Sequence, residues 1–123
     1  PGRRPALNKG PVFLFSFRWE TPAEGARLKS PHTIEIPFAS DNVKGAARLT
    51  GGGPEAMALA DRVSDAWIAF ARTGNPNTPK LPRWTAFNAT DRPTMVINNE
   101  SKLINDPIKE QRIVMWRALG YTS

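Results

Sequence analysis

The only histidine in this 123-residue sequence is His32, which lies in a short apolar segment, residues 30–38, that also contains two prolines. Histidine has an ordinary pKa near neutral pH, so this imidazole could accept and donate a proton during catalysis. A histidine in an apolar segment can equally be a hydrogen-bonded side chain of the protein core. The residues around His32 leave both interpretations open.

Glu35 is the second candidate, because it follows His32 by three residues, a spacing at which two side chains meet on a helical turn. Pro37, however, disfavours the helical conformation of the residue before it, so we predict an extended segment. In an extended segment Glu35 and His32 point to opposite faces, which favours Glu35 as a supporting residue over an acid that orients the imidazole. The apolar side chains of this segment would share one face: Ile34, Ile36 and Phe38.

A histidine base needs a nucleophile to deprotonate and an acid to orient it. No serine of the chain lies in G-x-S-x-G, the turn that exposes a nucleophile between a strand and a helix. The serines are Ser16, Ser30, Ser40, Ser64, Ser101 and Ser123. Three glycines at 51–53 resemble part of an oxyanion hole, but they also precede a predicted helix, which accounts for them. Taken alone, the sequence holds one of the three parts of a catalytic triad.

Composition excludes several other kinds of site. The chain has no cysteine, one histidine and no grouped carboxylates, so we expect no metal site and no cofactor. No apolar run is long enough to cross a membrane. The net charge of +6 could serve a nucleic acid, but the basic residues are scattered and no nucleic-acid-binding module is present. The densest basic cluster is Arg3, Arg4 and Lys9, in a polar stretch at 1–10 that we interpret as a loop or a severed helix end.

The periodicity of apolar residues predicts strands and helices in alternation. Residues 12–17 are nearly all apolar and predict a strand buried on both faces, as in a parallel sheet covered by helices. The connection 21–31 leads from the end of this strand to His32, and in open parallel sheets ligands bind beyond the carboxyl ends of strands. Two further short strands are predicted at 94–98 and 102–104, after a long proline-rich loop at 75–93.

Two helices are predicted. The helix at 54–73 has proline at its first position and Gly74 after its end. Its apolar stripe predicts that Trp67 is buried in the core with Val63 and Phe70, away from any substrate pocket. The final helix, 108–119, follows Pro107 and ends before Gly120. One of its faces would present Ile108, Arg112, Met115 and Leu119.

Several ordered motifs resemble the carboxyl-terminal part of type B carboxylesterases, a family that includes bacterial para-nitrobenzyl esterases and, more distantly, cholinesterases. The first motifs are residues 11–15, 17–20, 28–38 and 41–43, and the later ones are 60–77, 81–84, 94–96 and 105–107. Together they cover nearly all of the chain from Pro11 to Leu119. The departures are mild: Ala39 and Ser40 stand where the family often has a larger apolar pair, and Thr33 replaces a common small residue.

The resemblance implies an α/β-hydrolase fold, with a mostly parallel sheet flanked by helices, and a serine esterase mechanism. It implies that His32 is the catalytic histidine and that Glu35 is a supporting residue rather than the triad acid. The nucleophile and the triad acid would lie upstream, in agreement with the chain order serine, acid, histidine of this fold. Residues 1–123 would then be a single segment, which begins at Pro1 as if cut from something longer.

The function implied is therefore that of a carboxyl-terminal segment that supplies the histidine of an esterase for small-molecule carboxylic esters. Its other partner would be the remainder of the esterase chain, without which we expect no catalysis. The alternative is a non-catalytic, family-derived binding module, and a nucleic-acid binder is a third interpretation. The location in the cell stays open, because any signal peptide would precede this segment.

Overall fold

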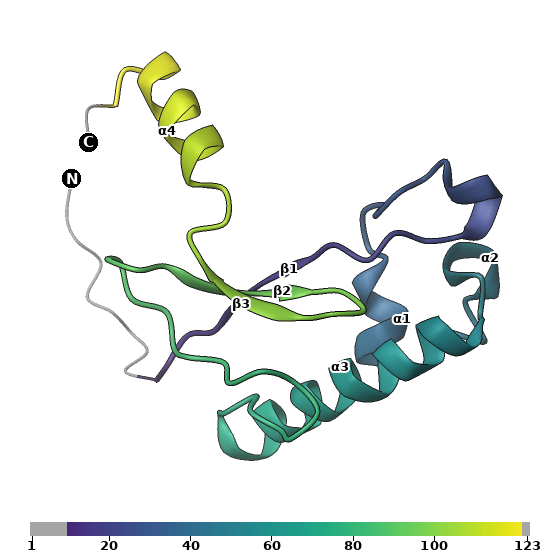
Figure 1. The fold of residues 1–123 in the computed structure, drawn as a ribbon. Helices are drawn as coiled ribbons and strands as arrows, with labels where there is room; N and C mark the ends of the chain where they lie inside the picture. Colours follow the sequence, from purple (N-terminus) through teal and green to yellow (C-terminus); the bar gives the residue numbers. More distant parts are fainter. Residues whose placement is uncertain (1–9, 122–123) are drawn as a thin grey trace.

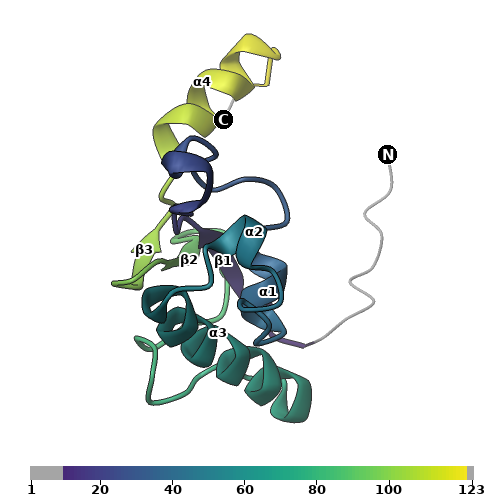
Figure 2. The ribbon, with the colours of Figure 1, turned by 90° about the vertical axis from the view of Figure 1, so that its right-hand side faces the viewer.

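The computed structural model describes residues 10–121 and has a small sheet between helices (Figure 1). The long helix α3 lies on one side of the sheet and α4 projects on the other, as a view turned by 90° also shows (Figure 2). The predicted loop at 1–10 lies, apart from Gly10, outside the described residues. In chain order the elements are β1 (Leu14–Phe17), the 3₁₀ helix η1 (Ala23–Ala26), α1 (Glu35–Ala39), α2 (Ala47–Thr50), α3 (Pro54–Thr73), β2 (Pro93–Ile97), β3 (Lys102–Asn105) and α4 (Lys109–Ala118).

The sheet has three strands in the order β1-β2-β3. β1 pairs with β2 in parallel, with Leu14 opposite Thr94, and β3 pairs with β2 antiparallel, with Leu103 opposite Met95. β2 is buried along its whole length, since it has a neighbouring strand on each side. The predicted strands at 94–98 and 102–104 are therefore confirmed within one residue at each end. The sheet of this segment is mixed, with one parallel and one antiparallel pair.

The first strand is present, but the prediction that it is buried on both faces is wrong for the described residues. β1 lies at the edge of the sheet, and Val12, Leu14 and Phe15 are 56%, 38% and 41% exposed. An apolar run becomes a buried strand only where neighbouring strands and covering layers surround it. Among the described residues β1 has one neighbouring strand, so part of its apolar surface stays open.

The long helix α3 has the predicted bounds. Gly53 is its N-cap, Pro54 takes the first helical position, and Gly74 ends it in the left-handed conformation with φ of 75°. The Gly74 amide donates to the carbonyl of Phe70 at 2.7 Å, as a glycine C-cap does. Its buried residues form one face toward the core: Ala56, Leu59, Ala60, Val63, Ser64 and Ala66.

The end of the apolar stripe on α3 is less buried than predicted. Trp67 is half-buried and Phe70 is 46% exposed, so the prediction that both lie in the core with Val63 is wrong. The Trp67 ring packs edge-on against Phe15, with 5.1 Å between ring centroids. Trp67 also lines a cavity of about 190 Å³ beside β1. This end of the stripe lies against aromatic side chains of the first strand region and of the loop after α3, because Phe70 contacts Phe13 and Trp67 also contacts Trp84.

The segment around Pro37 is helical, which contradicts the predicted extended conformation. α1 spans Glu35–Ala39, and Ile34 and Phe38, four residues apart, are buried while Ile36 is 56% exposed. Pro37 is tolerated because it occupies the first turn of the helix, where the amide it lacks would have no partner within the helix. The alternation of apolar residues at 34, 36 and 38 therefore did not indicate a strand.

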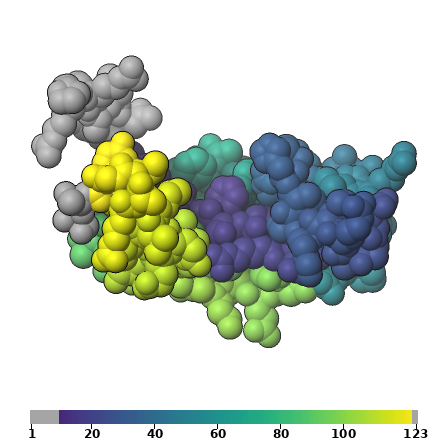
Figure 3. Space-filling view, turned by 90° about the horizontal axis from the view of Figure 1, so that it is seen from above, coloured from purple at the N-terminus to yellow at the C-terminus, as the bar shows by residue number. Residues whose placement is uncertain are grey.

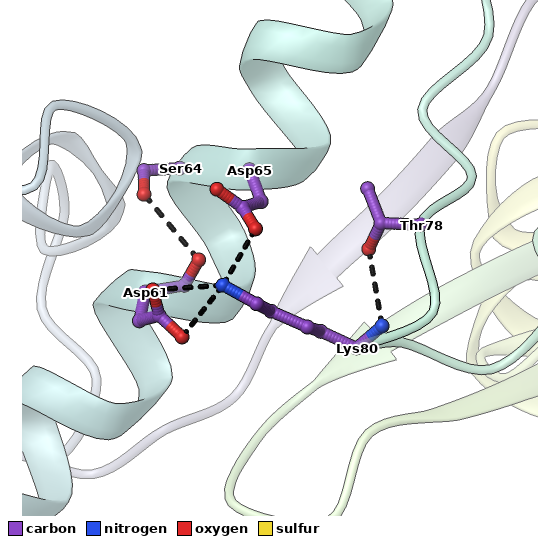
Figure 4. A network of polar contacts seen from close by, with 5 residues as sticks. All are labelled: Asp61, Ser64, Asp65, Thr78 and Lys80. Atoms are coloured by element: carbon purple, nitrogen blue, oxygen red, sulfur yellow. Dashed lines mark hydrogen bonds and ion pairs between the residues drawn. The ribbon is translucent and has the colours of Figure 1, made fainter.

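The predicted long loop after α3 runs back along the helix and is fastened to it. Trp84 is buried, and its indole Nε1 donates to the carbonyl of Leu14 at 3.0 Å. Lys80 reaches two carboxylates of α3, with its Nζ 2.6 Å from Asp65 and 2.9 Å from Asp61 (Figure 4). The carboxylates of Asp65 and then Asp61 raise the pKa of the Lys80 ammonium above its ordinary value. These contacts hold the loop against β1 and α3.

The last helix is confirmed, with α4 spanning Lys109–Ala118 where residues 108–119 were predicted. None of its residues is buried, and the expected apolar face presents Ile108, Met115 and Leu119 largely to solvent. Its attachment to the sheet is polar: Arg112 of α4 pairs with Asp106 just after β3, with 2.5 Å between Nη2 and Oδ2.

Among the described residues, no helix has both the length and the apolar character needed to cross a membrane.

Candidate active site

The loop that carries His32 is tied to the end of β1. The Ser30 hydroxyl donates to the carbonyl of Phe17, the last residue of β1, at 3.3 Å. The amide of Thr21 donates to the carbonyl of Lys29 at 2.9 Å, which closes the loop at its base. His32 therefore lies beyond the carboxyl end of β1, where the sequence placed it and where parallel sheets bind ligands.

A second set of contacts fixes the chain just after His32. The amide of Ile34 donates to the carbonyl of Pro31 at 3.2 Å, so His32 sits inside a tight turn. Ile34 and Phe38 then enter the core. The Phe38 ring lies 5.0 Å from the Phe17 ring and 4.9 Å from the Trp19 ring, measured between centroids. His32 is thus held between two anchored points.

The turn at His32 leaves its side chain exposed. The next residue, Thr33, has a φ of 71°, which is rare for a residue other than glycine. Its hydroxyl donates to the main-chain carbonyl of His32 at 2.5 Å, which supports this local conformation. Because the imidazole is exposed, the interpretation of His32 as a core histidine does not hold for the described residues.

The Glu35 side chain is not paired with the His32 imidazole in the described part of the chain. Glu35 is the first residue of α1 and is half-buried, and no hydrogen bond or ion pair between these two side chains occurs in the described part of the chain. The sequence spacing would have brought them together only if a regular helix began at His32. The helix begins three residues later, after the turn.

The serines of the described residues are engaged with nearby groups and not with the imidazole. Ser30, Ser40, Ser64 and Ser101 each donate to a main-chain carbonyl, and Ser16 accepts from Arg18 Nε at 3.3 Å. Within residues 10–121, then, no serine is positioned to lose a proton to His32. Ser123 lies outside the described residues.

The glycines at 51–53 join two helices. Gly51 ends α2 with a φ of 74°, Gly52 has a φ of 61°, and Gly53 caps α3. A Cβ on Gly51 would lie 2.9 Å from Cγ of Pro22, so a side chain is excluded by both conformation and space. This arrangement supports the interpretation that these glycines form the turn before a helix.

Among the described residues, no cluster of three or more histidine, cysteine or acidic side chains could hold a metal ion.

Two positioning residues could not be recognised from the sequence. Ser30 resembles a turn residue, and its bond to Phe17 spans 13 positions. Thr21 is fully buried, and its hydroxyl donates to the carbonyl of Leu49 at 2.5 Å, which ties the same loop to α2. The only signal for Thr21 was a hydroxyl residue in the loop that follows a strand, and such residues are common in loops.

The match to a known family agrees with this geometry. The family model described as the carboxylesterase family matches residues 3–116. The chain belongs to the carboxylesterase family. The resemblance to type B carboxylesterases is thereby confirmed, together with an α/β-hydrolase fold for this segment.

The relatives of this carboxylesterase segment include proteins named as esterases. It is 32% identical to the para-nitrobenzyl esterase of Bacillus subtilis (strain 168) over 112 residues, which are 89% of this chain. The solved structure of a thermophilic PNB esterase is 33% identical, covers 84% of this chain and has a TM-score of 0.72. An esterase of Clostridium hathewayi, at 24% identity and a TM-score of 0.76 over 89% of this chain, shares the fold.

The carboxylesterase segment spans only a part of these relatives. It covers 22% of the length of the Bacillus subtilis esterase and 21% of the thermophilic PNB esterase structure. Most of the polypeptide that forms an esterase of this family therefore has no counterpart in the 123 residues.

Proposed function

We propose that this chain is the carboxyl-terminal segment of a type B carboxylesterase and that His32 is the catalytic base of the complete enzyme. The observation that carries the proposal is the exposed imidazole, held beyond the carboxyl end of β1 by the bond between Ser30 and Phe17. Family membership supports the reaction class, since the matched relatives are named as esterases. The substrates would be small-molecule carboxylic esters.

The proposed reaction needs the imidazole in two successive roles. His32 takes the proton of a serine hydroxyl, supplied by the remainder of the esterase chain, as that oxygen attacks the ester carbonyl. The protonated ring then gives this proton to the leaving alkoxide as the carbon–oxygen bond breaks. In the second half of the cycle the ring takes a proton from water as the water oxygen attacks the acyl-enzyme. The ring then returns this proton to the serine oxygen as its bond to the acyl carbon breaks, which releases the carboxylic acid and restores the neutral imidazole.

The remaining parts of the site would come from outside this segment. Each serine of the described residues already has another hydrogen-bond partner, and in this part of the chain no hydrogen bond or ion pair joins Glu35 to His32. We therefore propose that the nucleophile and the acid that orients the imidazole lie upstream in the complete enzyme, with Glu35 as a supporting residue near the site. The isolated 123-residue chain would not catalyse ester hydrolysis. No metal ion or cofactor takes part in the proposed steps.

A fluorophosphonate that reacts with activated serines tests this proposal. The complete polypeptide should be labelled on one upstream serine, and the isolated chain should take no label. His32→Ala should slow labelling of the complete polypeptide, because the serine then loses its base. A complete polypeptide that takes no label would contradict the proposal and favour the non-catalytic binding module.

A further inference from the structure

One carboxylate joins three segments near the carboxyl ends of β1 and β2. Glu55, in the first turn of α3, accepts a hydrogen bond from the indole Nε1 of Trp19 at 3.2 Å and a second one from the side-chain amide of Asn99. Trp19 lies two residues after β1, and Asn99 lies in the turn between β2 and β3. The Glu55 carboxylate therefore connects the ends of two neighbouring strands to the start of the long helix.

The Trp19 side chain leads from this carboxylate toward the segment that carries His32. The indole is 2% exposed, and its ring packs edge-on against the ring of Phe38 with 4.9 Å between centroids. Phe38 belongs to α1, which begins three residues after His32. Seen from above, the segment that contains η1 lies at the surface beside β1, so the chain that leads to His32 is supported from the core side (Figure 3).

The hydrogen bond to Glu55 fixes the orientation of the indole. A buried tryptophan N–H usually has an acceptor, and among the described residues the Glu55 carboxylate is the acceptor of this one. A hydrogen bond favours a nearly linear N–H···O arrangement, so the carboxylate restrains the rotation of the ring about its side-chain bonds. The face of the indole that Phe38 contacts is thereby restrained as well.

Other contacts hold the turn between β2 and β3 without involving Trp19. Arg62 of α3 donates from Nη2 to the main-chain carbonyl of Asn99 at 3.2 Å. The Asn98 side-chain amide donates to the main-chain carbonyl of Arg18 at 3.3 Å. The turn is thus fastened to α3 and to the chain after β1 even without Glu55, so a variant of Arg62 separates attachment of the turn from orientation of the indole.

We propose that Glu55 is a positioning residue for His32, on which it acts through the rings of Trp19 and Phe38. The inference rests on the proposed function, because it takes His32 to be the catalytic base. The carboxylate orients the indole, the indole supports the Phe38 ring, and Phe38 anchors the helix that follows the imidazole. A general base must lie within hydrogen-bond reach of the proton it removes, so a small displacement of the imidazole slows the reaction more than it weakens substrate binding.

Turnover of p-nitrophenyl acetate by variants of the complete esterase tests the path through the indole. Glu55→Ala removes the acceptor and Trp19→Phe removes the donor, so each should lower kcat by roughly 2–10-fold with little change in KM. The double variant should be no slower than Glu55→Ala, because both changes break the same contact. Multiplied losses in the double variant would overturn the proposal.

Two further variants separate this role from a general loss of stability. Glu55→Gln keeps an acceptor oxygen and should retain most of the rate. Arg62→Ala is the matched control on the same helix: it removes a bond to the turn between β2 and β3, does not affect Trp19, and should leave kcat unchanged. A loss of kcat in Arg62→Ala as large as that in Glu55→Ala would overturn the proposal.

Amide hydrogen exchange of residues 34–38 in the complete polypeptide measures the same effect without relying on activity. The amides of Ile34 and Ile36 donate to main-chain carbonyls within this segment, at 3.2 and 3.1 Å. Glu55→Ala should speed exchange here several-fold, whereas Glu55→Gln and Arg62→Ala should not. Unchanged exchange in Glu55→Ala would overturn the inference alone. Faster exchange in a polypeptide that hydrolyses no ester would support the inference about the segment and contradict the proposed function alone.

Discussion

The hydroxyl of Ser30 lies 3.3 Å from the carbonyl oxygen of Phe17 and ties the loop that carries His32 to the last residue of β1. This bond connects the loop that carries the candidate base to the sheet. The core contact between the Phe38 and Phe17 rings fixes the chain on the other side of the histidine. The position of the imidazole thus depends on two contacts with one strand end.

Removing the tether should therefore lower catalysis in the complete esterase. A hydrogen bond contributes about 0.5–1.5 kcal/mol, so Ser30→Ala should reduce kcat by roughly 2–10-fold with little change in KM. Ser30→Thr, which keeps a hydroxyl, should restore much of the rate. Ser40→Ala is the matched control, because the Ser40 hydroxyl donates to Ile36 within the neighbouring turn and not to the strand. Equal effects of the two alanine variants on kcat would contradict the positioning role of Ser30.

The exposed edge of β1 leads to a prediction about the isolated chain. Apolar edge strands pair readily with other copies, so the 123-residue chain should be poorly soluble, oligomeric or only partly ordered. Leu14→Lys should reduce this self-association, since a charged residue on an edge strand opposes pairing. Size-exclusion chromatography and NMR spectra of both proteins measure the effect. Sharp, dispersed signals from a dilute wild-type monomer would contradict the expectation.

The two faces of α3 should respond differently to truncation. Leu59 is fully buried, so Leu59→Ala should cost about 2–5 kcal/mol of unfolding free energy. Met57, on the same helix and 39% exposed, is the control, and Met57→Ala should cost less than about 1 kcal/mol. Urea denaturation of the complete polypeptide measures both. A loss at Met57 as large as that at Leu59 would show that the buried face of α3 has been assigned wrongly.

The pair of Asp106 and Arg112 should make the attachment of α4 sensitive to acid. The hydrogen bond from the Arg112 guanidinium holds the pKa of the Asp106 carboxyl below its ordinary value of 3.8. A carboxyl whose pKa is lowered by folding stabilises the folded state above the unfolded pKa, and this contribution disappears as the pH falls through the folded pKa. Asp106→Asn should thus be less stable than wild type near neutral pH, and the difference should shrink below about pH 4.

Urea denaturation of the wild type and Asp106→Asn over this pH range checks the direction of the effect. The exposed Asp41 provides a control, since Asp41→Asn removes a carboxylate that has no ion pair among the described residues. A stability difference for Asp106→Asn that stayed constant from neutral pH to acid would contradict the expectation.

The parts of the fold that local residues determine were predictable from the sequence. The bounds of α3 agree because proline at the first position and glycine after the end act within one turn. The helical conformation of α1 could not be predicted, because Pro37 is disfavoured in most helices and tolerated only at its actual place in the first turn. The alternation of Ile34, Ile36 and Phe38 indicated the two-residue period of a strand. The segment is instead a helix, in which Phe38 packs against Phe17 and Trp19 in the core.

The position of His32 after the first strand was predictable from the sequence, but the contacts that hold its loop were not. His32 could be found because it is the only histidine and follows the connection from a strand. Its tether through Ser30 joins residues distant in sequence, so no spacing indicates it.

The turnover of p-nitrophenyl acetate by the complete esterase and its His32→Ala variant tests the central claim most directly. If His32 is the catalytic base, the variant should lose roughly 10⁴-fold or more in kcat, with a smaller effect on KM, because the imidazole acts mainly in the transition state. Glu35→Gln, prepared in the same background, should have a milder effect if Glu35 only supports the site. A His32→Ala enzyme that keeps near-wild-type turnover would contradict the account.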